Sequence, residues 1–167
     1  MDSETLKSLL KLEPLTVEGG YFAESYRAAD FIAAECLPER YNGARRVSTA
    51  IYYLLEPGTF SEMHRVASDE IFHFYFGDPV EMLQLWPDGT GRQVLIGTDF
   101  ARGMRPQVLV PRGVWQGARL AAGGTLALMG CTVSPGFEYA DYESGARAEL
   151  TRRYPEFREM ISALTRG

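Results

Sequence analysis

The chain has 167 residues, of which 46% are hydrophobic and 23% are charged. This length is sufficient for one domain whose hydrophobic core needs no disulfide or metal in order to fold. The sequence has 17 Lys and Arg residues against 22 Asp and Glu residues, which gives a formal net charge of -5. That balance argues against a non-specific nucleic-acid binder, because such proteins present a basic face. The hydrophobic fraction excludes a wholly disordered chain.

The first part of the chain contains one short predicted helix. Leu6, Leu9 and Leu10 form an apolar stripe with helical spacing, which predicts a helix over Ser3–Leu12. Residues 30–44 contain proline, asparagine and glycine and are expected to form a loop.

The middle of the chain is typical of short strands, because it is rich in β-branched and aromatic residues and is divided by turn sequences such as Gly-Asp-Pro and Pro-Asp-Gly. Parallel sheets need crossover connections of about a dozen residues or more, and these are missing. The pattern therefore predicts an all-β fold, a sandwich or barrel of antiparallel strands. The predicted strands are Tyr21–Arg27, Val47–Leu55, Thr59–Val66, Glu70–Phe76, Val80–Trp86, Arg92–Ile96, Gln107–Val110, Trp115–Leu120 and Thr125–Val133.

The C-terminal part of the chain returns to a helical pattern. Glu143–Tyr154 is one predicted helix, and Pro155 is suited to the first position of a second. Phe157, Met160 and Ile161 would share the apolar face of that second helix.

The only two histidines, His64 and His73, lie in one short segment. Within it, Gly58, His64, Glu70 and Gly77 have the spacing G-x5-H-x5-E-x6-G. The segment is therefore the first candidate for a functional site.

This segment resembles the first sequence motif of the cupin superfamily, in which a second histidine stands where this chain has Val66. The second cupin motif resembles Pro111-Arg112-Gly113, with Gln116 in place of the motif's histidine. The segments Glu18-Gly19-Gly20-Tyr21-Phe22, Ser48-Thr49-Ala50-Ile51-Tyr52, Ser68-Asp69-Glu70-Ile71, Val110-Pro111 and Pro135-Gly136-Phe137-Glu138 are similar to the fifth cupin group, which is related in fold to sugar-nucleotide epimerases. The resemblance implies a cupin double-stranded β-helix, a jelly-roll barrel with short helices at its N- and C-terminal ends. It implies a single cupin domain over residues 1–167.

The resemblance also bears on metal binding, because metal-dependent cupins use three histidines and a glutamate. This chain keeps His64 and Glu70, whereas Val66 and Gln116 are not ligands of that kind, so we expect no cofactor. A divalent metal at His64 and Glu70 is the alternative, with His73 completing a site of two histidines and one carboxylate. Glu70 and His73 are three residues apart, however, and should face opposite sides of a strand unless a bulge intervenes.

We therefore predict that His64, Glu70 and Gln116 converge in the barrel and bind a small-molecule ligand, and that His73 either joins them or packs among its aromatic neighbours. His64 and Glu70 are the candidate catalytic residues, since neutral imidazole is a general base whose tautomer a carboxylate can hold. Arg65 is either solvated or a ligand for an anionic group.

Three functions remain open. The first is a metal-independent sugar-type isomerase or epimerase with His64 as its base. The second is a non-catalytic cupin that binds or senses a metabolite. The third is a metal-dependent cupin enzyme, an oxygenase or isomerase.

The expected ligand is a small molecule, of sugar or nucleotide-sugar type, and no nucleic acid. We expect a homodimer, because an open sandwich leaves sheet edges and faces that a second copy can cover. No apolar stretch approaches the ~20 residues of a membrane span. The N-terminus has no apolar signal region, so a cytoplasmic location is expected.

Overall fold

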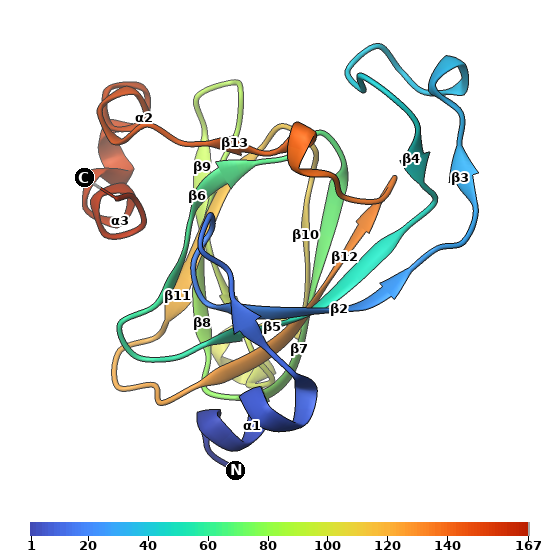
Figure 1. Ribbon diagram of the computed structural model, residues 1–167. Coiled ribbons are helices and arrows are strands. Elements are labelled where there is room, and N and C mark those ends of the chain that lie inside the picture. Colours follow the sequence, from blue (N-terminus) through green and yellow to red (C-terminus); the bar gives the residue numbers. More distant parts are fainter. Residues whose placement is uncertain (167) are drawn as a thin grey trace.

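The computed structural model describes residues 1–166, and most of its regular structure is antiparallel strand (Figure 1). The predicted all-β class is confirmed, with helices at both ends of the chain. The elements are α1 (Ser3–Leu10), β1 (Glu13–Pro14), β2 (Tyr21–Arg27), β3 (Phe31–Ile32), η1 (Ala34–Cys36), β4 (Arg45–Arg46), β5 (Thr49–Leu55), β6 (Phe60–Arg65), β7 (Asp69–Gly77), β8 (Val80–Leu85), β9 (Gly91–Ile96), η2 (Phe100–Arg102), β10 (Gln107–Val110), β11 (Trp115–Leu120), β12 (Ala127–Ser134), η3 (Tyr139–Asp141), β13 (Glu143–Ser144), α2 (Arg147–Arg153), η4 (Pro155–Phe157) and α3 (Arg158–Ala163).

Two antiparallel sheets form the barrel. One has the strand order β1-β2-β5-β12-β7-β10, and the other has the order β13-β6-β11-β8-β9. Consecutive strands such as β5 and β6, or β7 and β8, belong to different sheets, so the chain alternates between them as in a jelly roll. The short pair β3 and β4 forms a separate arm beside one end of the barrel (Figure 1).

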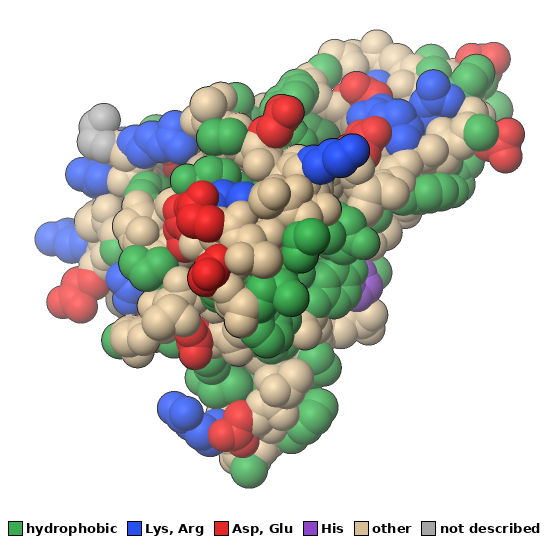
Figure 2. Space-filling model, turned by 60° about the horizontal axis from the view of Figure 1, so that its bottom comes forward, with side chains coloured by type: hydrophobic (Ala, Val, Ile, Leu, Met, Phe, Trp, Pro, Cys, Tyr) green, Lys and Arg blue, Asp and Glu red, His purple; other side chains and the backbone are tan. Residues whose placement is uncertain are grey.

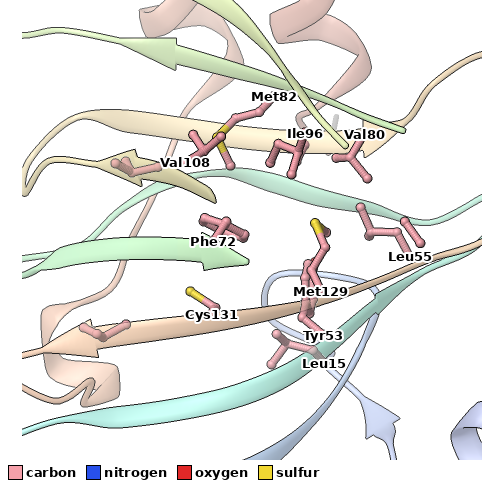
Figure 3. Close-up of a cluster of buried hydrophobic side chains, with 14 of the residues drawn as sticks. Leu15, Tyr53, Leu55, Phe72, Val80, Met82, Ile96, Val108, Met129 and Cys131 are labelled. Atoms are coloured by element: carbon pink, nitrogen blue, oxygen red, sulfur yellow. The ribbon is translucent and has the colours of Figure 1, made fainter. Parts of the chain in front are cut away.

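The main hydrophobic core lies between the two sheets (Figure 3). Phe72 and Met129 enter it from the six-stranded sheet, and Met82 and Ile96 enter it from the other. Side chains alternate across each strand, so these positions point inward while their neighbours point outward. The cluster fills one part of the interior and leaves the end near β13 and η3 to the polar residues described below.

Helices cover the outside of the barrel unevenly. Leu150 of α2 and Ile161 of α3 pack with Met63, Leu83 and Trp115 on the outer face of the five-stranded sheet. Helix α1 instead packs its leucines near one end of the six-stranded sheet (Figure 1). Within residues 1–166, the longest helix is far too short and polar to cross a membrane.

The prediction of a helix over Glu143–Tyr154 is wrong at its start, because the observed helix α2 begins only at Arg147. Glu143 and Ser144 instead form β13, which pairs with Arg65 and His64 of β6. This pairing satisfies backbone groups at the edge of β6, a tertiary effect that helical spacing in the sequence does not report. The first helix likewise ends at Leu10 rather than Leu12, because Lys11 adopts a left-handed conformation with φ 54°.

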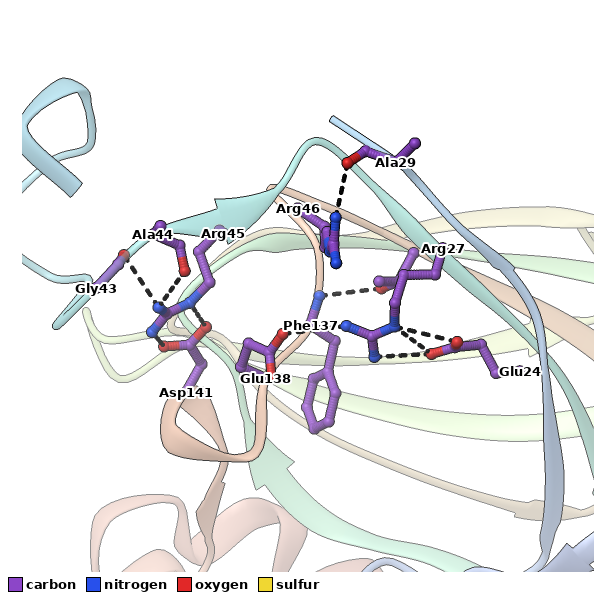
Figure 4. Close-up of polar contacts among 11 residues, drawn as sticks. Glu24, Arg27, Ala29, Gly43, Ala44, Arg45, Arg46, Phe137, Glu138 and Asp141 are labelled. Atoms are coloured by element: carbon purple, nitrogen blue, oxygen red, sulfur yellow. Dashed lines mark hydrogen bonds and ion pairs between the residues drawn. The ribbon is translucent and has the colours of Figure 1, made fainter. Parts of the chain in front are cut away.

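A buried ion pair anchors η3 across the end of the barrel (Figure 4). Two nitrogens of Arg45 donate to the two carboxylate oxygens of Asp141 at 2.7 and 2.6 Å. Arg45 also donates to the carbonyl oxygens of Gly43 and Ala44 and to the amide oxygen of Asn42. Both ion-pair side chains are only 4% exposed, so the segment carrying Asp141 is fixed to β4 by a desolvated, fully hydrogen-bonded contact.

We expect Arg45→Met to lower the free energy of unfolding by about 3–5 kcal/mol, because it leaves the Asp141 carboxylate buried without its partner. The matched control is Arg119→Met, whose ion pair with Glu81 is 43% and 30% exposed. Its loss should cost at most about 1 kcal/mol. Guanidinium denaturation of both variants measures the difference, and equal costs would contradict the structural role of the buried pair.

Candidate functional site

A cavity of about 180 Å³ lies between the sheets beneath η3 and the residues that follow it. Most of its wall is apolar, and its polar side chains are three glutamates, one arginine, one threonine, one imidazole and two tyrosines. The lining residues are Leu15, Val17, Glu18, Phe22, Glu24, Arg27, Thr49, Ile51, His64, Val66, Glu70, Cys131, Val133, Phe137, Tyr139 and Tyr142. Of the residues predicted from the sequence, His64 and Glu70 line this cavity, whereas Gln116 lies behind them.

His64 is placed by an irregularity in β6. Gln116 pairs with His64, yet Ala118 pairs with Ser61, so β6 has one extra residue between them. Both Ser61 and His64 therefore face the interior. The Nδ1 atom of His64 lies 2.6 Å from the carbonyl oxygen of Glu62. A carbonyl oxygen can only accept, so Nδ1 carries the proton and Nε2 presents its lone pair.

The side-chain amide of Gln116 joins His64 to Glu70. Its nitrogen lies 3.2 Å from His64 Nε2 and also donates to Glu70 Oε2. An amide nitrogen has two hydrogens, and both are used here. Its oxygen Oε1 is buried without a hydrogen-bond partner among residues 1–166. The three predicted residues thus converge, with Gln116 as the bridge between the other two.

Glu70 is held by groups from both sheets. Besides Gln116, the Cys131 thiol donates to Glu70 Oε1 at 2.5 Å. Burial raises the pKa of the Glu70 carboxyl above its ordinary value, although His64 and these hydrogen bonds oppose the shift. Burial also raises the pKa of the Cys131 thiol, and the neighbouring Glu70 adds to this effect. Cys131 is therefore a hydrogen-bond donor here and not a nucleophile.

The structure does not bring His73 to the site, which corrects its place among the candidate ligand-binding residues. It lies on the opposite face of β7 from Glu70, as strand alternation predicts. Its Nε2 atom is 3.2 Å from Thr132 Oγ1, and its Nδ1 atom is 3.4 Å from the Gln107 amide nitrogen. The bulge that would turn it inward is absent between residues 70 and 73 of β7.

Sequence reasoning missed Glu18, whose Oε2 lies 4.0 Å from His64 Nε2. Its Oε1 accepts a 2.6 Å hydrogen bond from Ser61, and its backbone oxygen accepts from the Glu62 amide at 2.8 Å. A turn with φ 107° at Gly19 places it there, and a Cβ at Gly19 would lie 2.1 Å from the Phe60 carbonyl oxygen. The Glu-Gly-Gly sequence was a usable signal, since only glycine permits this backbone so close to β6.

Sequence reasoning also missed Tyr142, a second side chain that lines the cavity. Its ring stacks on the His64 imidazole, with centroids 5.0 Å apart and an interplanar angle of 21°. Its hydroxyl is buried and has no hydrogen-bond partner among residues 1–166. Burial and the nearby Glu18 raise the pKa of this hydroxyl, so it is a donor throughout the neutral range. Only the anchored η3 segment brings it to the cavity, so local sequence contained no signal for it.

The donor set does not fit a divalent metal. A cupin ion would have to be shared by His64 Nε2 and the Glu70 carboxylate, and the Gln116 amide nitrogen already donates to both. An amide nitrogen has no lone pair available for a metal. In the described part of the chain, residues 1–166, no three His, Cys, Asp or Glu side chains are grouped so as to hold an ion.

Comparison with known proteins identifies the family. Residues 4–145 match the family Cupin_5, described as "Cupin superfamily (DUF985)". The chain belongs to this family. This cupin is therefore a member of a superfamily of small-molecule-binding barrels, and its jelly-roll fold agrees with that assignment.

Similar proteins share the fold over nearly the whole cupin chain. Protein SO0799 from Shewanella oneidensis is 32% identical with a TM-score of 0.87, over 99% of this chain and 98% of that one. A hypothetical protein from Leishmania major is 31% identical with a TM-score of 0.88, over the full length of both. The uncharacterized protein YML079W of Saccharomyces cerevisiae is 29% identical over 133 residues, and this match covers 75% of this chain and 66% of that relative's length.

More distant barrels share the fold alone. A variant of oxalate decarboxylase OxdC from Bacillus subtilis is 15% identical with a TM-score of 0.52. The match covers 88% of this cupin and 36% of that chain. At this identity the decarboxylase supports the barrel architecture and carries no argument about chemistry.

The raised pKa of Glu70 predicts a pH dependence of stability. An acid whose folded pKa exceeds its unfolded pKa binds its proton more tightly in the folded state. The free energy of unfolding must therefore fall as pH rises from the ordinary value of 4.5 through the folded pKa. Glu70→Gln removes this titration. Urea denaturation from about pH 5 to about pH 8 should show wild type losing stability relative to the variant. A constant difference between the two would contradict the assignment.

Proposed function

We propose that this cupin takes an uncharged, hydroxyl- or carbonyl-bearing part of a small molecule into its cavity and moves a proton on it without a metal. This is the chemistry of a sugar-type isomerase or epimerase. The observation that carries the proposal is the pair formed by His64 Nε2 and Glu18 Oε2, 4.0 Å apart at the wall of a mostly apolar cavity. A ligand oxygen can lie within hydrogen-bond distance of both atoms.

The size and charge of the cavity limit what it can take. Its volume of about 180 Å³ is smaller than the ~300–1,000 Å³ of sites for drug-sized molecules, which favours a sugar-sized or smaller group. Glu18, Glu24 and Glu70 line the wall, and the guanidinium of Arg27, which also lines it, is already paired with Glu24 and Glu138. An anionic group inside would therefore meet an excess of acidic side chains. If the ligand is a nucleotide sugar, its phosphates and nucleoside must therefore remain outside the cavity.

The proposed roles follow from the hydrogen bonds. The Glu62 carbonyl holds His64 in the tautomer whose Nε2 accepts a proton, which suits a general base. Glu18 holds the ligand hydroxyl beside that atom, and the unpartnered Tyr142 hydroxyl supplies a proton donor on the adjoining wall. Gln116 donates to Nε2, so proton uptake requires its amide to turn and present the unpartnered oxygen instead.

A second candidate function is binding without turnover. The observation that favours it is the same Gln116 contact, since a base whose lone pair is already bonded is not free to act until that contact breaks. Such a cupin would hold or sense a metabolite. Isotope exchange separates the two candidates, because binding alone leaves every C–H bond of the ligand intact.

We further propose that the protein is a homodimer whose interface is the outer face of the six-stranded sheet. That face carries Leu109 (47% exposed) and Tyr75 (53% exposed), with Tyr52 packed edge-on against Tyr75. Figure 2 shows hydrophobic side chains gathered over one side of the molecule. The outer face of the five-stranded sheet is covered by α2 and α3, whereas within residues 1–166 α1 packs on the six-stranded sheet only around Leu54 and Leu128 and leaves Leu109 and Tyr75 exposed.

For catalysis, we expect His64→Gln and Glu18→Gln each to slow proton exchange by about 100-fold or more, the usual contribution of a general acid or base. The measurement is deuterium incorporation from D₂O into a panel of pentoses, hexoses and their phosphates, followed by proton NMR. His73→Gln is the matched control, because that histidine lies outside the cavity. Binding of a panel member without exchange in the wild-type protein would instead establish the binding function.

For the cofactor, we expect protein purified without an affinity tag to contain less than about 0.1 equivalent of transition metal, because three or four protein ligands are normally needed and the Gln116 amide separates the two present. Inductively coupled plasma mass spectrometry measures the content. A stoichiometric metal that is lost in both His64→Gln and Glu70→Gln would overturn the metal-free mechanism.

For the assembly, light scattering at micromolar concentration should give the mass of two chains for the wild type. Leu109→Glu should shift the protein to monomer, because it places a charge in the proposed apolar interface. Leu9→Glu is the control, since Leu9 is 65% exposed on α1. A wild-type monomer, or a dimer that tolerates Leu109→Glu, would refute this interface.

A further inference from the structure

A second hollow adjoins the cavity. It is an open groove of about 580 Å³ beside η3 and the turn before β11. Val66 and Tyr142 line both the groove and the cavity, so these two side chains form the partition between them. The charged side chains of the groove are Arg40, Arg65, Arg112, Asp141 and Glu143.

The acidic groups of the groove are already neutralised. Asp141 accepts from Arg45 through both carboxylate oxygens. Glu143 accepts from Arg65 through both of its oxygens, at 2.8 and 2.9 Å. Arg65 also lies 4.5 Å from the centroid of the Trp115 ring, so it already has a carboxylate partner and an aromatic partner.

Two arginines of the groove remain without a carboxylate partner. Arg40 donates through its Nε atom to the Ala67 carbonyl oxygen at 3.0 Å, and its guanidinium lies 4.7 Å from the centroid of the Tyr41 ring. Arg112 is held through its backbone amide, which donates to Asp69 at 2.8 Å. Within residues 1–166, the Arg112 guanidinium makes no hydrogen bond or ion pair, and neither do the terminal nitrogens of Arg40.

We propose that this groove is a phosphate-binding site and that the ligand of this cupin is a phosphorylated small molecule. Two guanidinium groups offer planar pairs of donors, which match phosphate oxygens in a bidentate way. A phosphate dianion has enough acceptor oxygens for two guanidinium groups, whereas a carboxylate has enough for one. The inference rests on the proposed function only in assigning the uncharged end of that ligand to the cavity.

Electrostatics fixes the orientation of such a ligand. The cavity wall carries three glutamates, and its one arginine, Arg27, is already paired with Glu24 and Glu138, so the phosphate is excluded from the cavity and lies in the groove. The uncharged end then passes the partition at Tyr142 to reach His64, which the ring of Tyr142 already contacts. The groove would thus recognise the phosphate, and the cavity would hold the uncharged end on which the chemistry takes place.

Isothermal titration of the full chain with inorganic pyrophosphate at low ionic strength tests the site. Wild type should bind it, and Arg112→Gln and Arg40→Gln should each weaken binding about tenfold, the effect of losing charged hydrogen bonds. Arg112→Gln is the decisive variant, because its side chain makes no contact that folding requires. Arg102→Gln is the matched control, an exposed arginine of η2 outside the groove, and should bind as wild type does.

The variant His64→Gln separates this inference from the proposed function. It should retain pyrophosphate binding in full, whatever its effect on proton exchange, because His64 does not line the groove. Three results would overturn the inference: no pyrophosphate binding by wild type, an equal loss of binding in Arg102→Gln and Arg112→Gln, or malonate binding as tightly as pyrophosphate.

Discussion

The site depends on one buried amide. Gln116 of β11 donates to His64 of β6 and, across the barrel, to Glu70 of β7. A buried carboxylate without donors would cost several kcal/mol, so the two sheets can close at this end only because Gln116 and Cys131 satisfy Glu70. The same contact aligns the imidazole and occupies the position between the two side chains that a metal would need. The closure of the fold at this end, the orientation of the imidazole and the misfit of the donor set to a metal thus share one physical cause.

A second set of contacts fixes the side chains that surround this network. The bulge in β6 turns the Glu62 carbonyl toward His64 and gives Glu18 a backbone partner, so the residue missed in the sequence is held by the same irregularity that places the histidine. On the opposite wall, the Arg45–Asp141 pair fixes η3, and η3 carries the chain to Tyr142. These contacts are desolvated and geometrically specific, as expected for a site that must hold a small ligand in one orientation.

The distribution of charge differs between the two hollows. The interior combines an apolar wall with three glutamates and one arginine that is already paired, whereas within residues 1–166 the adjoining groove has two arginines without a carboxylate partner, on a chain of net charge -5. Substrate selection by charge outside the barrel and by shape within it is consistent with both proposals.

Local pattern determined the strands and a sandwich or barrel of antiparallel strands, because side-chain alternation and turn chemistry are properties of short segments. The jelly-roll class and the convergence of His64, Glu70 and Gln116 were predicted from the resemblance to the cupin motifs. Alternation also placed His73 on the outer face. Only the tertiary structure decided the rest. Glu18 and Tyr142 reach the cavity from segments far from the motif in sequence. The bulge in β6 turns the Glu62 carbonyl toward His64 and so fixes the tautomer of His64, and that tautomer requires the Gln116 amide to present its nitrogen to Nε2. β13 replaced the start of a predicted helix because an edge strand needed a backbone partner, a requirement that exists only after the sheets have formed.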